Sequence, residues 1–228
     1  MDNDALLQIV GLSMKVAFCS VLLSLPLAMI IAYVLARYDF PGKTIFDAIV
    51  HLPLVLPPVV IGFALLLTLG RNGPIGSLLH DWFGIVVAFK WTGAAIASAI
   101  MGFPLMVRAI RLSVMAIDRR IEHAARTLGA SPLRVLVSVV LPLALPGIIT
   151  GSVLSFARSL GEFGATITFV SNIPGQTQTL PLAIYTATQV PGDEAQIQAI
   201  WLSLVAVALS VAALAASEWL SRRYNTNA

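Results

Sequence analysis

Long stretches without charge constrain this chain more than any other feature. Between Ile9 and Ala36 the only charged residue is Lys15. Three further runs contain no Asp, Glu, Lys or Arg: 48–69, 135–157 and 195–217. A helix needs about 20 apolar residues to cross a bilayer, so each run predicts a membrane span. The composition agrees, because 11% of the residues are charged and a soluble domain has about a quarter. The mean hydropathy is +0.90.

A further span is predicted from about Thr92 to Val107, where the sequence is rich in Ala, Gly and Ser. Small residues let membrane helices pack closely, so this span belongs inside a bundle. Prolines interrupt the second and fourth spans, at positions 53, 57, 58, 142 and 146. Each proline leaves backbone carbonyls that need partners within the protein. We therefore expect an all-α membrane protein with about five transmembrane helices and one transmembrane domain, residues 1–228.

The distribution of Lys and Arg predicts the orientation. The loops after spans one and three, with the C-terminus, carry ten of these residues, and the opposite side carries three. The positive-inside rule places the N-terminus outside and the C-terminus in the cytoplasm. The net charge of +3 is therefore a signal of membrane topology, and nothing in it indicates nucleic-acid binding.

The stretch from Val107 to Pro132 is the long polar interval between spans three and four, and it predicts a short amphipathic helix over 117–130. Gly129 follows the last periodic residue, where a left-handed cap is favoured. Ser131 and Pro132 then suit the start of the next helix. The predicted apolar stripe contains Ile117, Ile121, Ala124, Ala125 and Leu128, and the other side contains Arg119, Arg120, His123 and Arg126. Such a helix can lie on lipid or dock on a protein, and the small Ala124–Ala125 pair favours a protein partner.

The sequence contains no phosphate-binding GxxxxGK[ST] loop and no recognisable catalytic motif. A membrane-embedded enzyme using Glu162 or His51 is one alternative, and a proton-driven secondary transporter is another. Glu162 lies one helical turn after Arg158 and is expected near membrane depth. Charged residues are costly there, so their presence suggests a functional role. Two interpretations of this pair stay open: an ion pair that fixes a bend, or a gate.

The segment EHAARTLGAS, followed by Leu141-Pro142, resembles the EAA motif of the membrane subunits of bacterial type I ABC importers. In that family the motif forms a cytoplasmic coupling helix that docks on the ATPase subunit. Ala124, Ala125 and Gly129 fit the motif's spacing. His123 stands where the motif has Glu, Glu122 lies one place earlier, and Val139 replaces an Ile.

Longer segments are similar to the molybdate permease family: HLPLVLPPVVIGFALLLTLGRNGPIG, FPLMVRAIRLSVMAID and SFARSLGEFGATITFVSNIPGQTQTLPLAIY. The resemblance implies a non-catalytic permease subunit in the bacterial inner membrane that passes molybdate, and also tungstate, into the cytoplasm. It further implies a homodimer, two ABC ATPase subunits that hold ATP and Mg, an outer molybdate-binding protein, and no cofactor on this chain. A sulfate permease of the same machinery is the nearest alternative.

Two groups of site residues follow. The coupling group contains Ala124, Ala125 and Gly129, with Glu122 and Arg126 at the rim of the docking surface. A divalent oxyanion cannot cross hydrocarbon unaided, and conduction favours weak, distributed contacts. Hydroxyl groups and helix ends near the broken helices would supply such contacts. The predicted pathway or gate contains Arg158, Ser159, Glu162, Phe163 and Thr166.

Overall fold

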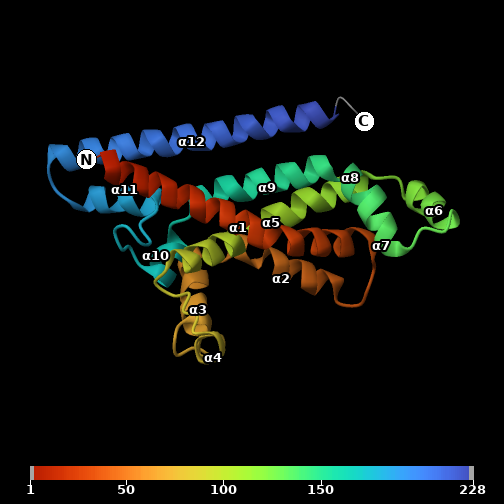
Figure 1. Ribbon diagram of the computed structural model, residues 1–228, viewed down its shortest axis with the longest axis horizontal. Helices are drawn as coiled ribbons and strands as arrows, with labels where there is room; N and C mark the ends of the chain where they lie inside the picture. The colour runs from red at the N-terminus through yellow and green to blue at the C-terminus, as the bar shows by residue number, and fades with distance from the viewer. Residues whose placement is uncertain (1–2, 226–228) are drawn as a thin grey trace.

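In the computed structural model, which describes residues 3–225 and the side chains of 4–216, every regular element is a helix (Figure 1). Three helices are long and apolar enough to cross a membrane: α1 (Asn3–Arg37), α5 (Trp91–Ala116) and α12 (Asp193–Asn225). Two bent helix pairs bring the possible number of spans to five. The shorter elements are α2 (Lys43–Val55), α3 (Pro58–Leu69), α4 (Pro74–Phe83), α6 (Arg119–Thr127), α7 (Pro132–Val135), the π-helix η1 (Leu136–Val140), α8 (Leu141–Leu143), α9 (Leu145–Leu160), α10 (Gly164–Val170) and α11 (Leu180–Gln189).

The centre of the bundle is α5, which packs against α1 on one side and α9 on the other. In its most apolar window 67% of the residues are buried, whereas the figure for α12 is 11%. Small residues explain this position. A Cβ atom added to Gly102 would lie 2.3 Å from Ser155 Oγ of α9, so the two helices meet at backbone distance. The predicted place of this span inside the bundle is confirmed.

The second span is sharply broken. Helices α2 and α3 meet at an angle of 110°, with Leu56 and Pro57 between them. Pro57 and Pro58 are consecutive residues without a backbone N–H, so the carbonyls of two successive residues lose their helical donors. The chain therefore turns, and α3 and α4 project from the side of the bundle (Figure 1). The prolines predicted an interruption of this span, and the structure shows the angle and direction of the bend.

The bend lets α3 pack against the short helix α10. A Cβ atom on Gly62 would lie 2.5 Å from the carbonyl oxygen of Ala165, so only glycine fits between these backbones. The fourth span is broken too, by 69° between Leu143 and Leu145, and the π-helix η1 lies just before Pro142. The helices that follow the two breaks, α3 and α9, are connected through α10. Three residues separate the end of α9 from the start of α10, and α10 packs against α3.

A candidate coupling helix and two arginine–glutamate pairs

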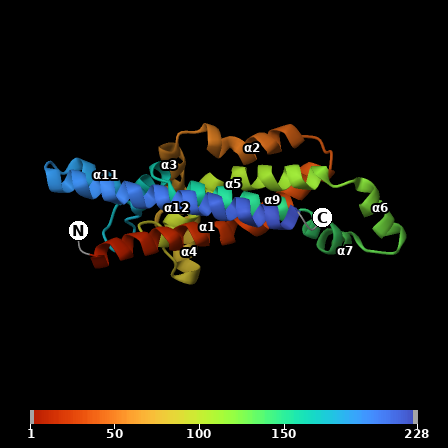
Figure 2. The same cartoon turned by 90° about the horizontal axis from the view of Figure 1, so that it is seen from above.

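Helix α6 lies at one end of the molecule, beyond the ends of α1, α5 and α9 (Figures 1 and 2). Asp118 caps its first turn by accepting a hydrogen bond from the Arg120 backbone N–H at 2.9 Å. Gly129 adopts φ +87°, and the N–H of Ala130 reaches back to the carbonyl of Ala125 at 3.1 Å. This is a Schellman C-cap. The structure has a helix inside the predicted range 117–130, shorter than expected, at Arg119–Thr127, and it ends at the expected glycine cap. The N-cap Asp118 is a feature that was not predicted from the sequence.

Most of the predicted apolar stripe of α6 is exposed in the structure. Leu128 is 89% exposed and Ile121 is 47% exposed. Ala124 is also exposed, Ala125 is half-buried, and a Cβ atom on Gly129 would meet nothing within 4 Å. Contiguous exposed apolar groups mark sites of interaction. Ile117 differs from the rest of the predicted stripe, because it lies outside α6 as the C-cap of α5 and is buried in the main core.

The expected position of Glu122 at the rim of this surface is wrong. Its side chain is 7% exposed and its Oε1 lies 2.5 Å from Arg37 Nη2, at the last residue of α1. The same Nη2 donates a hydrogen bond of 3.1 Å to the Ile117 carbonyl. A buried guanidinium needs an opposite charge beside it, and the Glu122 carboxylate supplies that charge. The pair therefore connects α6 to α1. Arg126 is exposed, as the expected rim position requires.

The second pair joins α9 to α10. Arg158 Nη1 lies 2.8 Å from Glu162 Oε2, and Glu162 is 1% exposed. The other carboxylate oxygen accepts a hydrogen bond from the Ala165 backbone N–H at 2.8 Å. Glu162 thus neutralises Arg158 and caps the first turn of α10 at once, where an anion is favoured. This geometry is that of an ion pair that fixes a bend.

The other predicted pathway residues are held by partners within the chain. Ser159 Oγ lies 2.8 Å from Ser20 Oγ of α1, and both residues are buried. Thr166 donates to the Phe163 carbonyl at 2.9 Å, and the Phe163 ring lies 5.1 Å from the ring of Tyr185. The structure therefore brings all five predicted residues into one region around the α9–α10 junction. The Ser159 hydroxyl joins α9 to α1, and the Thr166 hydroxyl bonds within the first turn of α10.

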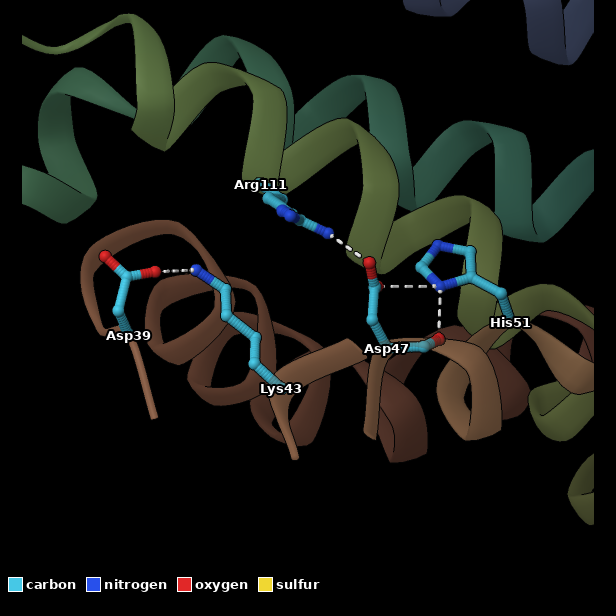
Figure 3. Close-up of polar contacts among 5 residues, drawn as sticks. All are labelled: Asp39, Lys43, Asp47, His51 and Arg111. Atoms are coloured by element: carbon cyan, nitrogen blue, oxygen red, sulfur yellow. Dashed lines mark hydrogen bonds and ion pairs between the residues drawn. The ribbon is translucent and has the colours of Figure 1, made fainter. Parts of the chain in front are cut away.

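A further polar contact holds α2 against α5 (Figure 3). Arg111 Nη1 of α5 lies 2.9 Å from Asp47 Oδ2, and His51 Nδ1 lies 2.9 Å from the Asp47 carbonyl oxygen and 3.1 Å from Oδ1. Sequence reasoning missed this cluster and the role of Arg37. The i, i+4 spacing of Asp47 and His51 was a usable signal, but neither arginine is near its partner in sequence.

Membrane-length helices, two broken spans and an exposed, capped amphipathic helix at one end define a membrane subunit of a transport system. Residues 24–226 match the family described as binding-protein-dependent transport system inner membrane component, and the chain belongs to that family. It is accordingly a multi-pass inner-membrane protein.

Among its relatives is the "Molybdenum transport system permease protein ModB" of Escherichia coli K12, which is 57% identical over 94% of this chain and 93% of that protein. ModB of Haemophilus influenzae is also 57% identical, with the same coverage. A probable sulfate transport system permease protein of Chlorokybus atmophyticus is 42% identical, over 69% of this chain and 54% of that protein.

Solved structures show the same fold. The inward-facing MetNI methionine ABC transporter matches 98% of this chain and 99% of its own, with a TM-score of 0.72 and 15% identity. A bacterial alginate ABC transporter in complex with a pentasaccharide-bound periplasmic protein has a TM-score of 0.74 and 16% identity, with 97% of this chain and 80% of its own covered.

Proposed function

We propose that this chain is the permease subunit of an ABC importer that passes molybdate, and also tungstate, into the cytoplasm. The observation that carries the proposal is the 57% identity to molybdenum permeases over nearly the whole of both chains. The sulfate permease relative is less similar and is covered over only 54% of its length. Sulfate is therefore the second candidate cargo.

The proposal includes a homodimer of this chain, two ATPase subunits that hold ATP and Mg, and an outer binding protein that delivers the anion. The chain itself would catalyse no reaction. The exposed apolar side of α6, with Ala124, Ala125 and Gly129, is the surface we assign to the ATPase subunit. The N-terminus would lie outside and α6 in the cytoplasm, because Arg37, Lys43 and the arginines of α6 gather at one end of the bundle.

Three connections would carry a movement of α6 into the membrane. The Arg37–Glu122 pair links α6 to α1, buried Ile117 links it to α5, and α7 with η1 links it to α9. When ATP binding draws the ATPase subunits together, α6 would move with them and shift all three helices. The α9–α10 junction, held by Arg158 and Glu162 and flanked by Ser159, Phe163 and Thr166, is the hinge that we assign to the gate.

The test is the ATPase activity of the complete complex in proteoliposomes, titrated with molybdate, tungstate and sulfate in the presence of the binding protein. We expect stimulation by molybdate and tungstate and none by sulfate. Stimulation by sulfate alone would retain the importer and change its cargo. A well-formed complex that responds to none of the three anions would refute the proposed substrate class.

A further inference from the structure

A pocket of about 130 Å³ lies between the end of α1 and helix α6. Three arginines line it: Arg37 from α1, and Arg119 and Arg126 from α6. Glu122 is the one acidic residue in its lining. The rings of Tyr33 and Tyr38, packed edge to face at 6.0 Å, form the opposite wall. Positive charge and hydrogen-bond donors are therefore concentrated around a small pocket where α1 meets α6.

The positive charge of this pocket is only partly compensated. Glu122 neutralises Arg37, but Arg119 and Arg126 form no ion pair with any residue that the structure describes. Arg37 itself is 8% exposed, and its Nε is buried without a hydrogen-bond partner among residues 4–216. Glu122 Oε1 is likewise buried and has its ion pair with Arg37 but no hydrogen bond there. A buried donor without an acceptor is costly, so this arrangement favours an additional acceptor nearby.

We propose that this pocket binds a small oxyanion with the charge and shape of phosphate, sulfate or molybdate. Guanidinium groups present several N–H donors in a planar fork that suits oxyanions, and two tyrosine hydroxyls add neutral donors. The chemistry is the same for a free anion and for the phosphate of a lipid headgroup. The proposal rests on the proposed function for the cytoplasmic position of the pocket and for the effect of the bound anion on coupling.

The position of the pocket gives the bound anion a consequence. An anion between Arg37 and Arg119 would bridge α1 and α6 in parallel with the Arg37–Glu122 pair. Binding to the folded chain alone raises its thermal stability by mass action. Because the bound anion would contact both helices, it would hold α6 more firmly against α1. The coupling of ATP hydrolysis to transport would then depend on the oxyanion concentration in the cytoplasm.

The adjacent arginines of α6 provide a matched test. Arg119 lines the pocket, whereas Arg120 is also exposed and does not line it. We would measure phosphate and molybdate binding by calorimetry on the full chain in nanodiscs of neutral lipid. Arg119→Gln should weaken binding about tenfold, as loss of one charge-assisted contact does. Arg120→Gln should change it less than about twofold, since long-range charge is screened.

Two further arms identify the source of the anion. If phosphatidylglycerol in the nanodisc blocks phosphate binding to the parent chain, a lipid headgroup occupies the site; if binding persists, the ligand is a free anion. Either result supports the site when only Arg119→Gln weakens it. Equal effects of both substitutions, or no binding in either bilayer, would overturn it. So would loss of binding in neutral lipid on adding the ATPase subunit, because an acidic side chain of the partner would then fill the pocket.

These measurements use the permease chain without the binding protein or a transport cycle. A complex that is stimulated only by sulfate would contradict the proposed cargo and leave the comparison of Arg119 with Arg120 unchanged. Absence of anion binding would contradict the pocket and leave the ATPase titration valid.

Discussion

Among the side chains that the structure describes, two glutamates are almost fully buried beside an arginine, and the two pairs differ in what they connect. Arg37 and Glu122 belong to different helices, α1 and α6, and lie far apart in sequence. Arg158 and Glu162 are one helical turn apart. The first pair therefore fixes the position of an element relative to the bundle, and the second fixes the local path of the chain at a bend.

Their surroundings reinforce this difference. Glu162 is 1% exposed and also caps α10. Arg37 and Glu122 lie at the end of the bundle beside exposed residues, and their pocket is open to solvent. Removing Glu162 leaves Arg158 without its partner and the Ala165 N–H without an acceptor, whereas removing Glu122 leaves Arg37 with its hydrogen bond to the Ile117 carbonyl. We therefore expect the α9–α10 pair to matter more for stability and the α1–α6 pair to matter more for coupling.

The largest expected effect comes from Glu162→Ala. It removes the partner of Arg158 and the cap of α10, and should destabilise the chain by about 3 kcal/mol, in the range for breaking a buried pair. Glu162→Gln keeps an acceptor for the Ala165 N–H and should cost less than half as much. Thermal unfolding in detergent would measure both. Equal losses for the two variants would mean that the charge alone matters and that the cap contributes little.

Glu122→Ala should have a smaller effect on stability, about 1–2 kcal/mol, because Arg37 keeps its hydrogen bond to the Ile117 carbonyl and no helix cap is lost. Its main consequence should be uncoupling, with ATP hydrolysis retained and anion uptake per ATP lowered severalfold. Uptake and hydrolysis would be measured in the same proteoliposomes.

The exchanged pair Arg37→Glu with Glu122→Arg is the control for that prediction. It restores the opposite charges, so it should recover part of the uptake that either single substitution loses. If the double variant behaves as the sum of the single variants, the two side chains do not act through each other, and the tether between α1 and α6 is refuted.

Two glycines with nearly the same positive φ allow the effect of backbone strain to be distinguished from an effect on docking. Gly129 has φ +87°, Gly42 has φ +85°, and a Cβ atom on either would meet nothing within 4 Å. Substituting leucine at each should cost about 1–2 kcal/mol of left-handed strain. Only Gly129→Leu should raise the ATP consumed per anion, because only its side chain would enter the surface assigned to the ATPase subunit. Similar coupling in both variants would remove Gly129 from that surface.

The same contrast between local and distant connections explains what sequence could predict. The cap at Gly129, the buried position of α5 and the Arg158–Glu162 spacing all depend on residues within a few turns, and the structure agrees with each. The direction of the 110° bend depends on how α3 packs on α10 at Gly62, which no local pattern encodes. Glu122 was misplaced for the same reason. Its partner, Arg37, is on another helix, and the helical pattern alone put its side chain on the outer rim.

The smallest expected effect concerns the hydroxyl groups near the α9–α10 junction. Ser159 and Ser20 share a buried hydrogen bond, and such bonds between membrane helices contribute about 0.6 kcal/mol on average. A double-mutant cycle of Ser20→Ala and Ser159→Ala should therefore give a coupling energy of that order. If Ser159→Ala combined with Thr166→Val leaves the transport rate unchanged, these hydroxyls only hold helices together, and the anion pathway must be sought elsewhere. A large loss of transport with the stability change below about 1 kcal/mol would instead give them a role in passing the anion, since packing alone does not produce that combination.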